Sequence, residues 1–187
     1  MILSNLSILS AIASGDLNIE GLNGLDPTKA PFNTSSVDLR LGATIVIPKK
    51  FEEPIDLRHS YPSSVLTQHS KHVTLTEREP FILEPGQFVL GNTLERVTFP
   101  RKIGRPAYSG RVEGKSSRAR FGLAVHITAP TIHNDFSGTV TLEIMNFGQS
   151  PIFLHPGVYI CQLIVEQLDA VPFSAPNQFS GQSTPIG

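Results

Sequence analysis

The sequence predicts a mainly β protein of the sandwich, barrel or jelly-roll kind. After one early helical pattern, short runs rich in β-branched and aromatic residues follow one another along the chain. Turn-forming residues separate these runs, since the 187 residues include 15 Gly and 15 Pro. The last long run is apolar on both alternating faces, as in a strand covered on two sides. These three patterns are typical of all-β folds with many short strands.

The first element is expected to be a short helix that begins after Ser4. The Ser4 hydroxyl can accept a hydrogen bond from a free backbone N–H of the first turn. Ile8, Leu9 and Ile12 then fall on one face, at the spacing of a helix. Gly15 follows where helices often end with a residue in the left-handed conformation. These signals predict one early helix before the strands begin.

The expected strands share β-branched or aromatic residues and are bounded by Pro or Gly. In the first half of the chain they span residues 37–41, 43–47, 72–76, 81–83, 87–90 and 94–99. In the second half they span residues 124–128, 138–146, 152–154 and 158–168. Residues 21–36 and a tail of residues 172–187 lack such a pattern and are expected to be irregular. Either irregular segment is a candidate for a flexible lid.

The strand expected at residues 158–168 carries two alternating apolar sets. One set contains Tyr159, Cys161, Leu163 and Val165, and the other contains Val158, Ile160 and Ile164. We therefore expect both faces to be covered, either by a second sheet or by another subunit. Cys161 is the only cysteine of the chain, so no intramolecular disulfide can form. Its apolar surroundings indicate a buried, unreactive thiol.

Length and composition narrow the class of protein. A chain of 187 residues that is 40% hydrophobic can build one well-buried core, so residues 1–187 are expected to form one domain. A formal net charge of −1 argues against binding nucleic acid through a broad basic surface. The N-terminal residues lack a signal-peptide pattern, and no apolar run approaches the roughly 20 residues of a membrane span. We expect a cytoplasmic protein with neither membrane nor nucleic-acid partner.

Residues 114–120, with the sequence GKSSRAR, are a candidate anion site. Ser116 or Ser117 can cap a helical turn that ends near Gly122 and leaves backbone N–H groups pointing outward. Lys115, Arg118 and Arg120 would add positive charge around that turn. The alternative is a solvated charged turn whose serines only cap the helix. The local sequence does not favour either interpretation over the other.

Glu143 is a lone carboxylate in the apolar run at residues 138–146. Strand alternation places Val140, Leu142 and Ile144 on one face, and Thr139, Thr141, Glu143 and Met145 on the other. If the second face borders a pocket, Glu143 is a candidate general base. An isolated glutamate in a strand is, however, more often exposed to solvent. The local sequence therefore favours the exposed glutamate.

Histidines offer a metal site as another alternative. His126, His133, Glu143 and His155 follow the order of the ligands in a cupin-like jelly roll. The first two ligands of that family stand two residues apart, so that their side chains share one strand face. Seven positions separate His126 from His133 in this chain. The spacing therefore disfavours metal ligation.

Three segments carry a family resemblance. Residues 110–123 (GRVEGKSSRARFGL), residues 125–129 (VHITA) and residues 138–146 resemble the dCTP deaminase branch of the dUTPase-like trimers. Further matches reach both ends of the chain, at residues 1–4, 36–42, 85–90, 156–157, 162–163 and 179–182. The resemblance implies a dUTPase-like distorted β-barrel or jelly roll with a short N-terminal helix and a few helical turns. It also implies a homotrimer whose three active sites are shared between neighbouring subunits.

The activity that the resemblance implies is hydrolytic deamination of dCTP to dUTP and ammonia, in pyrimidine deoxynucleotide metabolism. Mg²⁺ would be bound together with the triphosphate. No zinc is expected, because the chain has no His-x-Glu motif and its one cysteine cannot supply a Pro-Cys-x-x-Cys pair. By the same resemblance Glu143 would be the general base, and Ser116 and Arg120 would lie near the reacting centre.

The remaining implied contacts are with the nucleotide. The triphosphate would be bound by Lys115, Ser116, Ser117, Arg118, Ala119 and Arg120. The backbone of Thr128 and Ala129 would border the base and the water, and that of Thr141 and Leu142 would flank the base. Gln182 would fold over the nucleotide.

The chain departs from the family pattern at a few positions. His133 stands where the family usually has an aspartate that contacts the sugar hydroxyl, and Asp135 is a candidate to compensate. Gln178 and Phe179 replace a Lys-Tyr pair in the tail, and Phe173 is a candidate to replace a tyrosine that stacks on the base. Three functions stay open: a dCTP deaminase, a dUTPase or bifunctional enzyme that releases pyrophosphate, and an inactive nucleotide-binding trimer.

Overall fold

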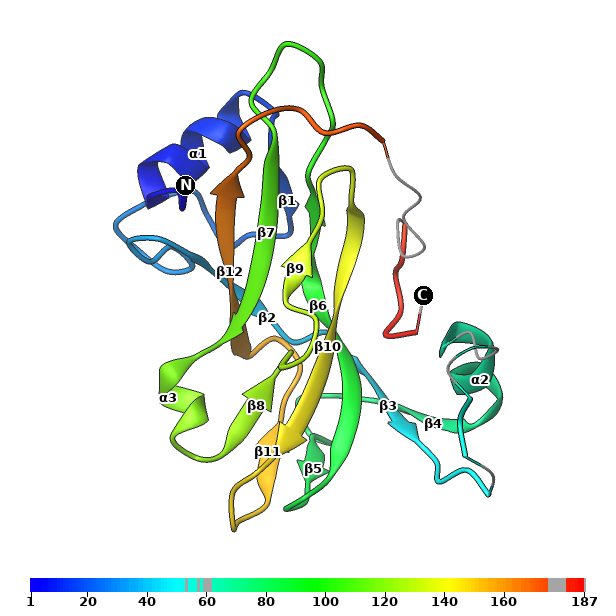
Figure 1. Cartoon of the computed structure of the whole chain (residues 1–187). Helices are drawn as coiled ribbons and strands as arrows, with labels where there is room; N and C mark the ends of the chain where they lie inside the picture. Colours follow the sequence, from blue (N-terminus) through cyan, green and yellow to red (C-terminus); the bar gives the residue numbers. More distant parts are fainter. Residues whose placement is uncertain (53, 57, 59–61, 175–180, 187) are drawn as a thin grey trace.

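A computed structural model describes residues 1–52, 54–56, 58, 62–174 and 181–186. These residues form a mainly β structure with every strand pair antiparallel (Figure 1). The larger sheet has the order β4 (Ser70–Thr74), β3 (Thr44–Pro48), β6 (Phe88–Thr98), β10 (Ser137–Asn146) and β8 (Leu123–Val125), and β1 (Asn18–Glu20) also pairs with β6. The second sheet has the order β2 (Val37–Arg40), β12 (Tyr159–Gln167), β7 (Tyr108–Gly114) and β9 (Thr131–Ile132).

A small third sheet and three helices complete the described part of the chain. The third sheet pairs β5 (Phe81–Leu83) with β11 (Ile152–Leu154). The helices are α1 (Asn5–Ala13), α2 (Pro62–Gln68) and α3 (Ser116–Ala119). Among the described residues, no helix combines the length and the apolar character of a membrane span.

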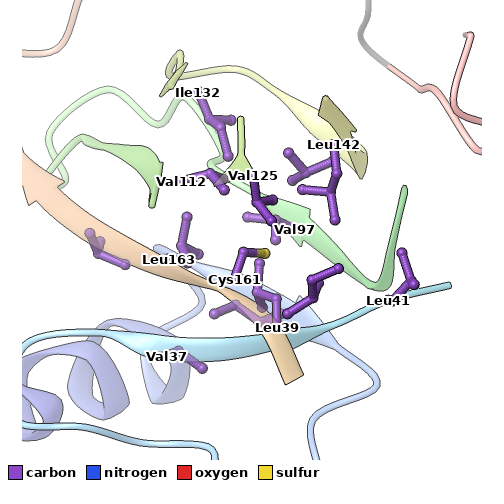
Figure 2. Close-up of a cluster of buried hydrophobic side chains, with 14 of the residues drawn as sticks. Val37, Leu39, Leu41, Val97, Val112, Val125, Ile132, Leu142, Cys161 and Leu163 are labelled. Carbon is purple, nitrogen blue, oxygen red and sulfur yellow. The ribbon is translucent and has the colours of Figure 1, made fainter. Parts of the chain in front are cut away.

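The core lies between the two main sheets. Figure 2 shows Val97 and Leu142 of the larger sheet facing Val112, Cys161 and Leu163 of the second sheet. All five side chains are buried, and full burial of a Val or Leu side chain contributes about 1.5–3 kcal/mol. Cys161 is buried as predicted, and burial raises the pKa of its thiol well above the ordinary value.

The two faces of β12 differ in their coverage. Cys161, Leu163 and Val165 are buried in the core, whereas Ile164 on the other face is only half-buried. A shift in the pairing with β2 between Tyr159 and Cys161 interrupts the alternation, and this explains why Ile160 is buried as well. The expected cover on both faces is therefore complete on one face and partial on the other within a single chain.

The predicted helix is confirmed. The Ser4 hydroxyl accepts a hydrogen bond from the Ser7 N–H at 3.3 Å, and Gly15 adopts a left-handed φ of +71°. Several strands also match the prediction, with β5 and β11 at the expected residues and β10 extended by one residue at its start. The irregular character of residues 21–36 is confirmed except for short turns and one isolated bridge.

Other strand predictions were wrong, for reasons that lie in tertiary packing. The runs predicted at 87–90 and 94–99 form one strand, β6, because the missing side chain of Gly91 makes room for Leu41 and Ile144. The run predicted at 124–128 ends at Val125, because His126 adopts a φ of +60°. The strand β7 was missed, since its Gly110 leaves space for the ring of Phe99 where a strand residue would carry a side chain.

A contact between two glycines positions α3. Gly122, with a φ of +87°, lies against Gly148 in the turn that follows β10, and the Phe147 N–H donates to the Gly122 carbonyl at 2.8 Å. A methyl group added at Gly122 would lie 2.2 Å from the Gly148 nitrogen. The Asn146 side chain fixes this turn by donating to the carbonyls of Leu83 and Ser150. The end of α3 is thereby fastened to the end of β10.

We predict that Gly122→Ala destabilises the fold far more than Gly157→Ala. Gly157 has a similar φ of +78° but open space around its Cα, so its substitution should cost only the left-handed strain of about 1–2 kcal/mol. Gly122→Ala should add about 2 kcal/mol or more for the backbone clash. Urea unfolding of both variants measures the difference. Equal losses of unfolding free energy would contradict the proposed close contact.

A second anchor joins the end of α1 to the loop before β7. Asp16 is only 4% exposed, and Arg105 donates to both of its carboxylate oxygens, at 2.9 Å and 2.6 Å. These hydrogen bonds from Arg105 lower the pKa of Asp16 in the folded protein, and the Ser14 hydroxyl assists them. Because the folded pKa is depressed, the stabilisation is present above the unfolded pKa and is lost as the pH falls through the folded pKa.

We therefore predict that Asp16→Asn lowers the melting temperature by several degrees at about pH 7 and has a smaller effect at about pH 3. At about pH 3 the pH lies below the ordinary Asp pKa, so part of the stabilisation that comes from the lowered folded pKa is already lost in the wild type. Asp169→Asn, at an exposed position, serves as the control. Thermal unfolding at several pH values tests this, and a constant gap between wild type and Asp16→Asn would argue against it.

Candidate active site

A cavity of about 440 Å³ opens beside β10, between the 126–136 segment, α2 and the C-terminal tail. Its polar lining residues are His126, Thr131, His133, Thr141, Glu143 and Gln182. Apolar side chains complete the walls, among them Leu66 of α2 and Leu90 of β6. A mostly apolar pocket with a few convergent polar groups is the usual form of a small-molecule site.

A second cavity of about 460 Å³ lies next to α3. Its lining includes Arg118, Phe121 and Phe153 but contains no carboxylate. Acid–base chemistry on a bound ligand needs a group that accepts and returns a proton. The cavity beside β10 is therefore the candidate active site, since it contains Glu143 and two histidines.

Glu143 lies on the cavity side of β10, opposite Leu90 of β6 in the strand register. The predicted alternation is confirmed, because Val140, Leu142 and Ile144 are buried while Glu143 is half-buried. The Thr128 hydroxyl donates to Glu143 Oε2 at 2.7 Å. The structure thus decides between the two local interpretations, and the glutamate borders a cavity instead of standing on an open face.

The segment 126–129 forms a tight loop over Glu143. The His126 N–H donates to the Glu143 carbonyl at 2.7 Å, and His126 Nε2 lies 2.6 Å from the Ala129 carbonyl. Because a carbonyl only accepts, Nε2 carries the proton in this contact. Nδ1 is buried and has no hydrogen-bond partner among the described residues. The position of His126 in the cavity was not predicted from the sequence, where this residue was only a candidate metal ligand.

The alternative metal ligands are only partly brought together. His126, His133 and Glu143 line the cavity, whereas His155 follows β11 and its ring lies 6.2 Å from that of Phe153. Within the described part of the chain, no group of three or more His, Cys, Asp or Glu residues is placed to hold a metal ion.

The described end of the tail runs along β10 and forms one wall of the cavity. The Gly181 N–H donates to the Ser137 carbonyl at 2.6 Å, and the Thr139 N–H donates to the Gln182 carbonyl at 3.1 Å. The Gln182 side chain donates to the Thr139 carbonyl at 2.7 Å. Beyond Gln182, both Pro185 and Ile186 line the cavity, and neither was anticipated from the sequence.

The remaining predicted contact residues belong to the tail and to β10. Phe173 is 96% exposed and does not line the cavity. Gln178 and Phe179 lie outside the described residues. Leu142 is fully buried in the core, so it can offer a ligand only its backbone, as expected. The Thr141 hydroxyl donates to the Pro185 carbonyl at 3.3 Å and so joins the strand to the tail.

His133 and Asp135 have different positions relative to the cavity. His133 follows β9 directly and lines the cavity. Asp135 does not line it; its N–H donates to the Phe99 carbonyl at 2.8 Å and its φ is +73°. The structure therefore gives no support to Asp135 as a substitute for the aspartate that His133 replaces.

The basic turn begins differently from the prediction. The helix α3 starts at Ser116, and Lys115 is its N-cap residue with an extended backbone. Arg118 and Ala119 both donate their N–H groups to the Lys115 carbonyl at 2.9 Å. The predicted cap by Ser116 or Ser117 was wrong, because both residues lie inside the turn. Their hydroxyls are exposed, as are Arg118, Ala119 and Arg120.

Among the cations of the basic turn, Lys115 is distinguished by a buried partner. Its ammonium forms an ion pair with the carboxylate of Asp38, which is 7% exposed. Asn33 donates to the other Asp38 oxygen at 2.9 Å. Gln162 of β12 accepts from Ser36 and donates to the Gly114 carbonyl at 3.4 Å. This network fastens the start of the turn to both β2 and β12.

The basic turn and the cavity are separate within one subunit. None of residues 115–120 lines the cavity that contains Glu143. Figure 1 shows α3 and the C-terminal tail on opposite sides of β10. The residues expected to bind a triphosphate therefore do not meet the candidate base inside a single chain.

We predict that Lys115→Met destabilises the protein by about 3–5 kcal/mol, because it leaves the buried Asp38 carboxylate without its cation. The double variant Lys115→Met/Asp38→Asn also lacks the carboxylate charge, so it should recover most of the lost stability. Lys29→Met is the matched control, since the ion pair of Lys29 with Asp26 is exposed and should matter little. Urea unfolding of the variants decides the matter, and a Lys115→Met protein as stable as wild type refutes the prediction.

Comparisons with known proteins agree on one family. A family model described as dCTP deaminase-like matches residues 2–168. The dUMP-forming dCTP deaminase of Halobacterium salinarum is 38% identical over 169 residues, which cover 90% of this chain and 81% of that protein. The dUMP-forming dCTP deaminase of Corynebacterium diphtheriae is 35% identical over 193 aligned residues, which cover 99% of this chain and 95% of that protein.

A solved structure shares the fold. The crystal structure of 2′-deoxycytidine 5′-triphosphate deaminase from Agrobacterium tumefaciens matches with a TM-score of 0.65 at 21% sequence identity, covering 89% of this chain. The match covers 47% of that chain, so the present chain spans about half of its length. This likeness confirms the predicted mainly β fold.

Proposed function

The chain belongs to the dCTP deaminase-like family, and from this premise we propose that it catalyses the hydrolytic deamination of dCTP to dUTP and ammonia. One structural observation carries the proposal: the half-buried Glu143 carboxylate borders a cavity of about 440 Å³. The polar and apolar walls of that cavity suit a base and a deoxyribose. Residues 1–187 are proposed to form a single domain.

Glu143 is proposed as the general base. It takes a proton from the water molecule that attacks the ring carbon bearing the amine. It passes this proton to the ring nitrogen, and then takes the remaining proton from the hydroxyl now bound to the ring carbon and gives it to the amine. The carbon–nitrogen bond breaks, the carbonyl forms and ammonia leaves. The backbone of Thr128 and Ala129 is proposed to border the base and this water. Zinc is not part of the proposed reaction, since the chain lacks the motifs of zinc-dependent deaminases.

The triphosphate is proposed to bind at the basic turn, with Mg²⁺ as part of the bound substrate. Ser116, Ser117, Arg118 and Arg120 are exposed and free to face an anion from outside the subunit. Arginine forms bidentate hydrogen bonds with phosphate, which suits this task. Lys115 and Ala119 complete the proposed set, with the ammonium of Lys115 shared between the phosphates and Asp38.

A homotrimer is proposed because a single subunit does not join the turn to the cavity. If the turn of one subunit faces the cavity of its neighbour, Arg120 and Ser116 reach the reacting centre beside Glu143. Three such shared sites follow from threefold symmetry. Thr141, Leu142 and His133 would contact the nucleoside, and Gln182 would cover it from the tail. Phe173 and Gln178 are further proposed contacts, made when the tail closes over the nucleotide.

A second candidate function is the release of pyrophosphate after deamination. It is favoured by the names of relatives at 35–38% identity, from Methanosphaera stadtmanae, Halobacterium salinarum and Corynebacterium diphtheriae, which are dUMP-forming dCTP deaminases. Against it stands His133, which replaces the carboxylate that dUTP hydrolysis uses. We therefore propose deamination as the first function and dUMP formation as the second.

The experiment supplies dCTP or dUTP, each with Mg²⁺, and measures ammonia and pyrophosphate separately. We predict that wild type releases ammonia from dCTP, and that Glu143→Gln reduces this rate by about 10²-fold or more because the proton acceptor is lost. Binding of dCTP by Glu143→Gln should stay within about threefold of wild type.

Each result of this experiment has a distinct meaning. Pyrophosphate from dUTP supports the second candidate function, whether or not ammonia also appears. Binding of dCTP without either product would refute both proposals and indicate an inactive nucleotide-binding protein. A Glu143→Gln variant with the wild-type rate would refute the assignment of the base.

A further inference from the structure

Thr128 contacts the proposed base through its side chain. Its Oγ1 lies 2.7 Å from Glu143 Oε2. An ionised carboxylate can only accept a hydrogen bond, so the hydroxyl of Thr128 is the donor. Hydrogen bonds to charged groups are short and stronger than neutral ones, and 2.7 Å lies in their usual range.

The loop that carries Thr128 is held in register with Glu143. The N–H of His126 donates to the Glu143 carbonyl at 2.7 Å, which fixes one end of the loop on β10. At the other end, His126 Nε2 closes the loop on the Ala129 carbonyl at 2.6 Å. The left-handed conformation of His126, with a φ of +60°, turns the chain away from β8 and back over the carboxylate. The hydroxyl of Thr128 is therefore aimed at Glu143 by a backbone hydrogen bond on one side and a histidine side-chain contact on the other.

The contact makes the two carboxylate oxygens of Glu143 different. Oε2 receives the hydroxyl of Thr128, while Oε1 has no hydrogen bond to any of the described residues. The carboxylate belongs to the lining of the cavity, so Oε1 is the oxygen that is open to a ligand or to water. A general base must lie within hydrogen-bonding reach of the proton that it removes. Oε2 already accepts one hydrogen bond, whereas both lone pairs of Oε1 are available for this proton.

We propose that Thr128 is a positioning residue that fixes the Glu143 carboxylate, so that Oε1 is the atom that takes the proton from the attacking water. This inference rests on the proposed deamination of dCTP. As the oxygen of water bonds to the ring carbon, its proton moves to Oε1. Oε1 passes this proton to the ring nitrogen. It then takes the proton of the hydroxyl that has formed on the ring carbon and gives it to the amine, so that the carbon–nitrogen bond breaks, the carbonyl forms and ammonia leaves. Thr128 keeps its own proton throughout, and Oε2 remains its acceptor.

The expected effect is on turnover and not on binding. Without the hydroxyl, the carboxylate can rotate and present either oxygen, so fewer encounters have the productive geometry. Loss of a hydrogen bond to a charged group in a site closed by substrate should lower kcat about tenfold. KM for dCTP should stay within about twofold, since the hydroxyl of Thr128 is already taken by Glu143.

The test compares Thr128→Val, Thr128→Ser and Thr74→Val. Valine keeps the shape of threonine without the hydroxyl, and serine restores the hydroxyl without the methyl group. Thr74 is an exposed residue of β4 that does not line the cavity, so its substitution controls for the loss of a surface threonine. Ammonia release from dCTP with Mg²⁺ gives kcat and KM for each protein, and thermal unfolding checks that each one is folded.

The inference is supported if Thr128→Val loses kcat about tenfold at unchanged KM and melting temperature, and if Thr128→Ser recovers to within about threefold of wild type. It is overturned if Thr128→Val keeps the wild-type kcat, or if Thr128→Ser is as impaired as Thr128→Val. A Thr128→Val protein whose kcat falls only together with its melting temperature also overturns it, because the role is then structural. If the wild type itself releases no ammonia, the proposed function fails first, and this result is distinct from the others.

Discussion

The strict alternation of side chains along β10 is the constraint on which the rest of this structure depends. Val140, Leu142 and Ile144 are buried in the core, while Thr139, Thr141 and Glu143 point to the opposite side. Pairing with β6 on one side and with β8 on the other fixes this register. A shift by one residue would bring Leu142 to the cavity and force the carboxylate of Glu143 into the core. The same register of β10 therefore determines both the packing of the core and the position of the candidate base.

Sequence patterns predicted what depends on local spacing. The cap at Ser4, the left-handed Gly15 and the two faces of β10 all follow from neighbouring residues and were confirmed. The family was also recognisable, because its motifs lie in continuous segments such as residues 110–123. Where β-branched residues alternate without interruption, short-range information is enough to place a strand.

The remaining features depend on contacts between distant residues. Nothing near Gly110 in the sequence indicates that the ring of Phe99 needs its space, and so β7 was missed. The residues next to His126 do not indicate a left-handed backbone, because that conformation accompanies the hydrogen bond from its N–H to the distant Glu143 carbonyl. The burial of the Lys115 ammonium against Asp38 likewise joins residues that are far apart in the chain. Such tertiary contacts produce no local sequence pattern from which they could be predicted.

The tail also has a consequence for the solubility of the subunit. β8 covers one end of the outer edge of β10, at Ile144 to Asn146, and the tail covers the other end by bonding to Ser137 and Thr139. An uncovered strand edge presents free N–H and C=O groups that can recruit a strand from another molecule. The segment that forms one wall of the cavity therefore also covers this strand edge, and a chain shortened before Gly181 would leave the backbone groups of Ser137 and Thr139 open to β-pairing with another molecule.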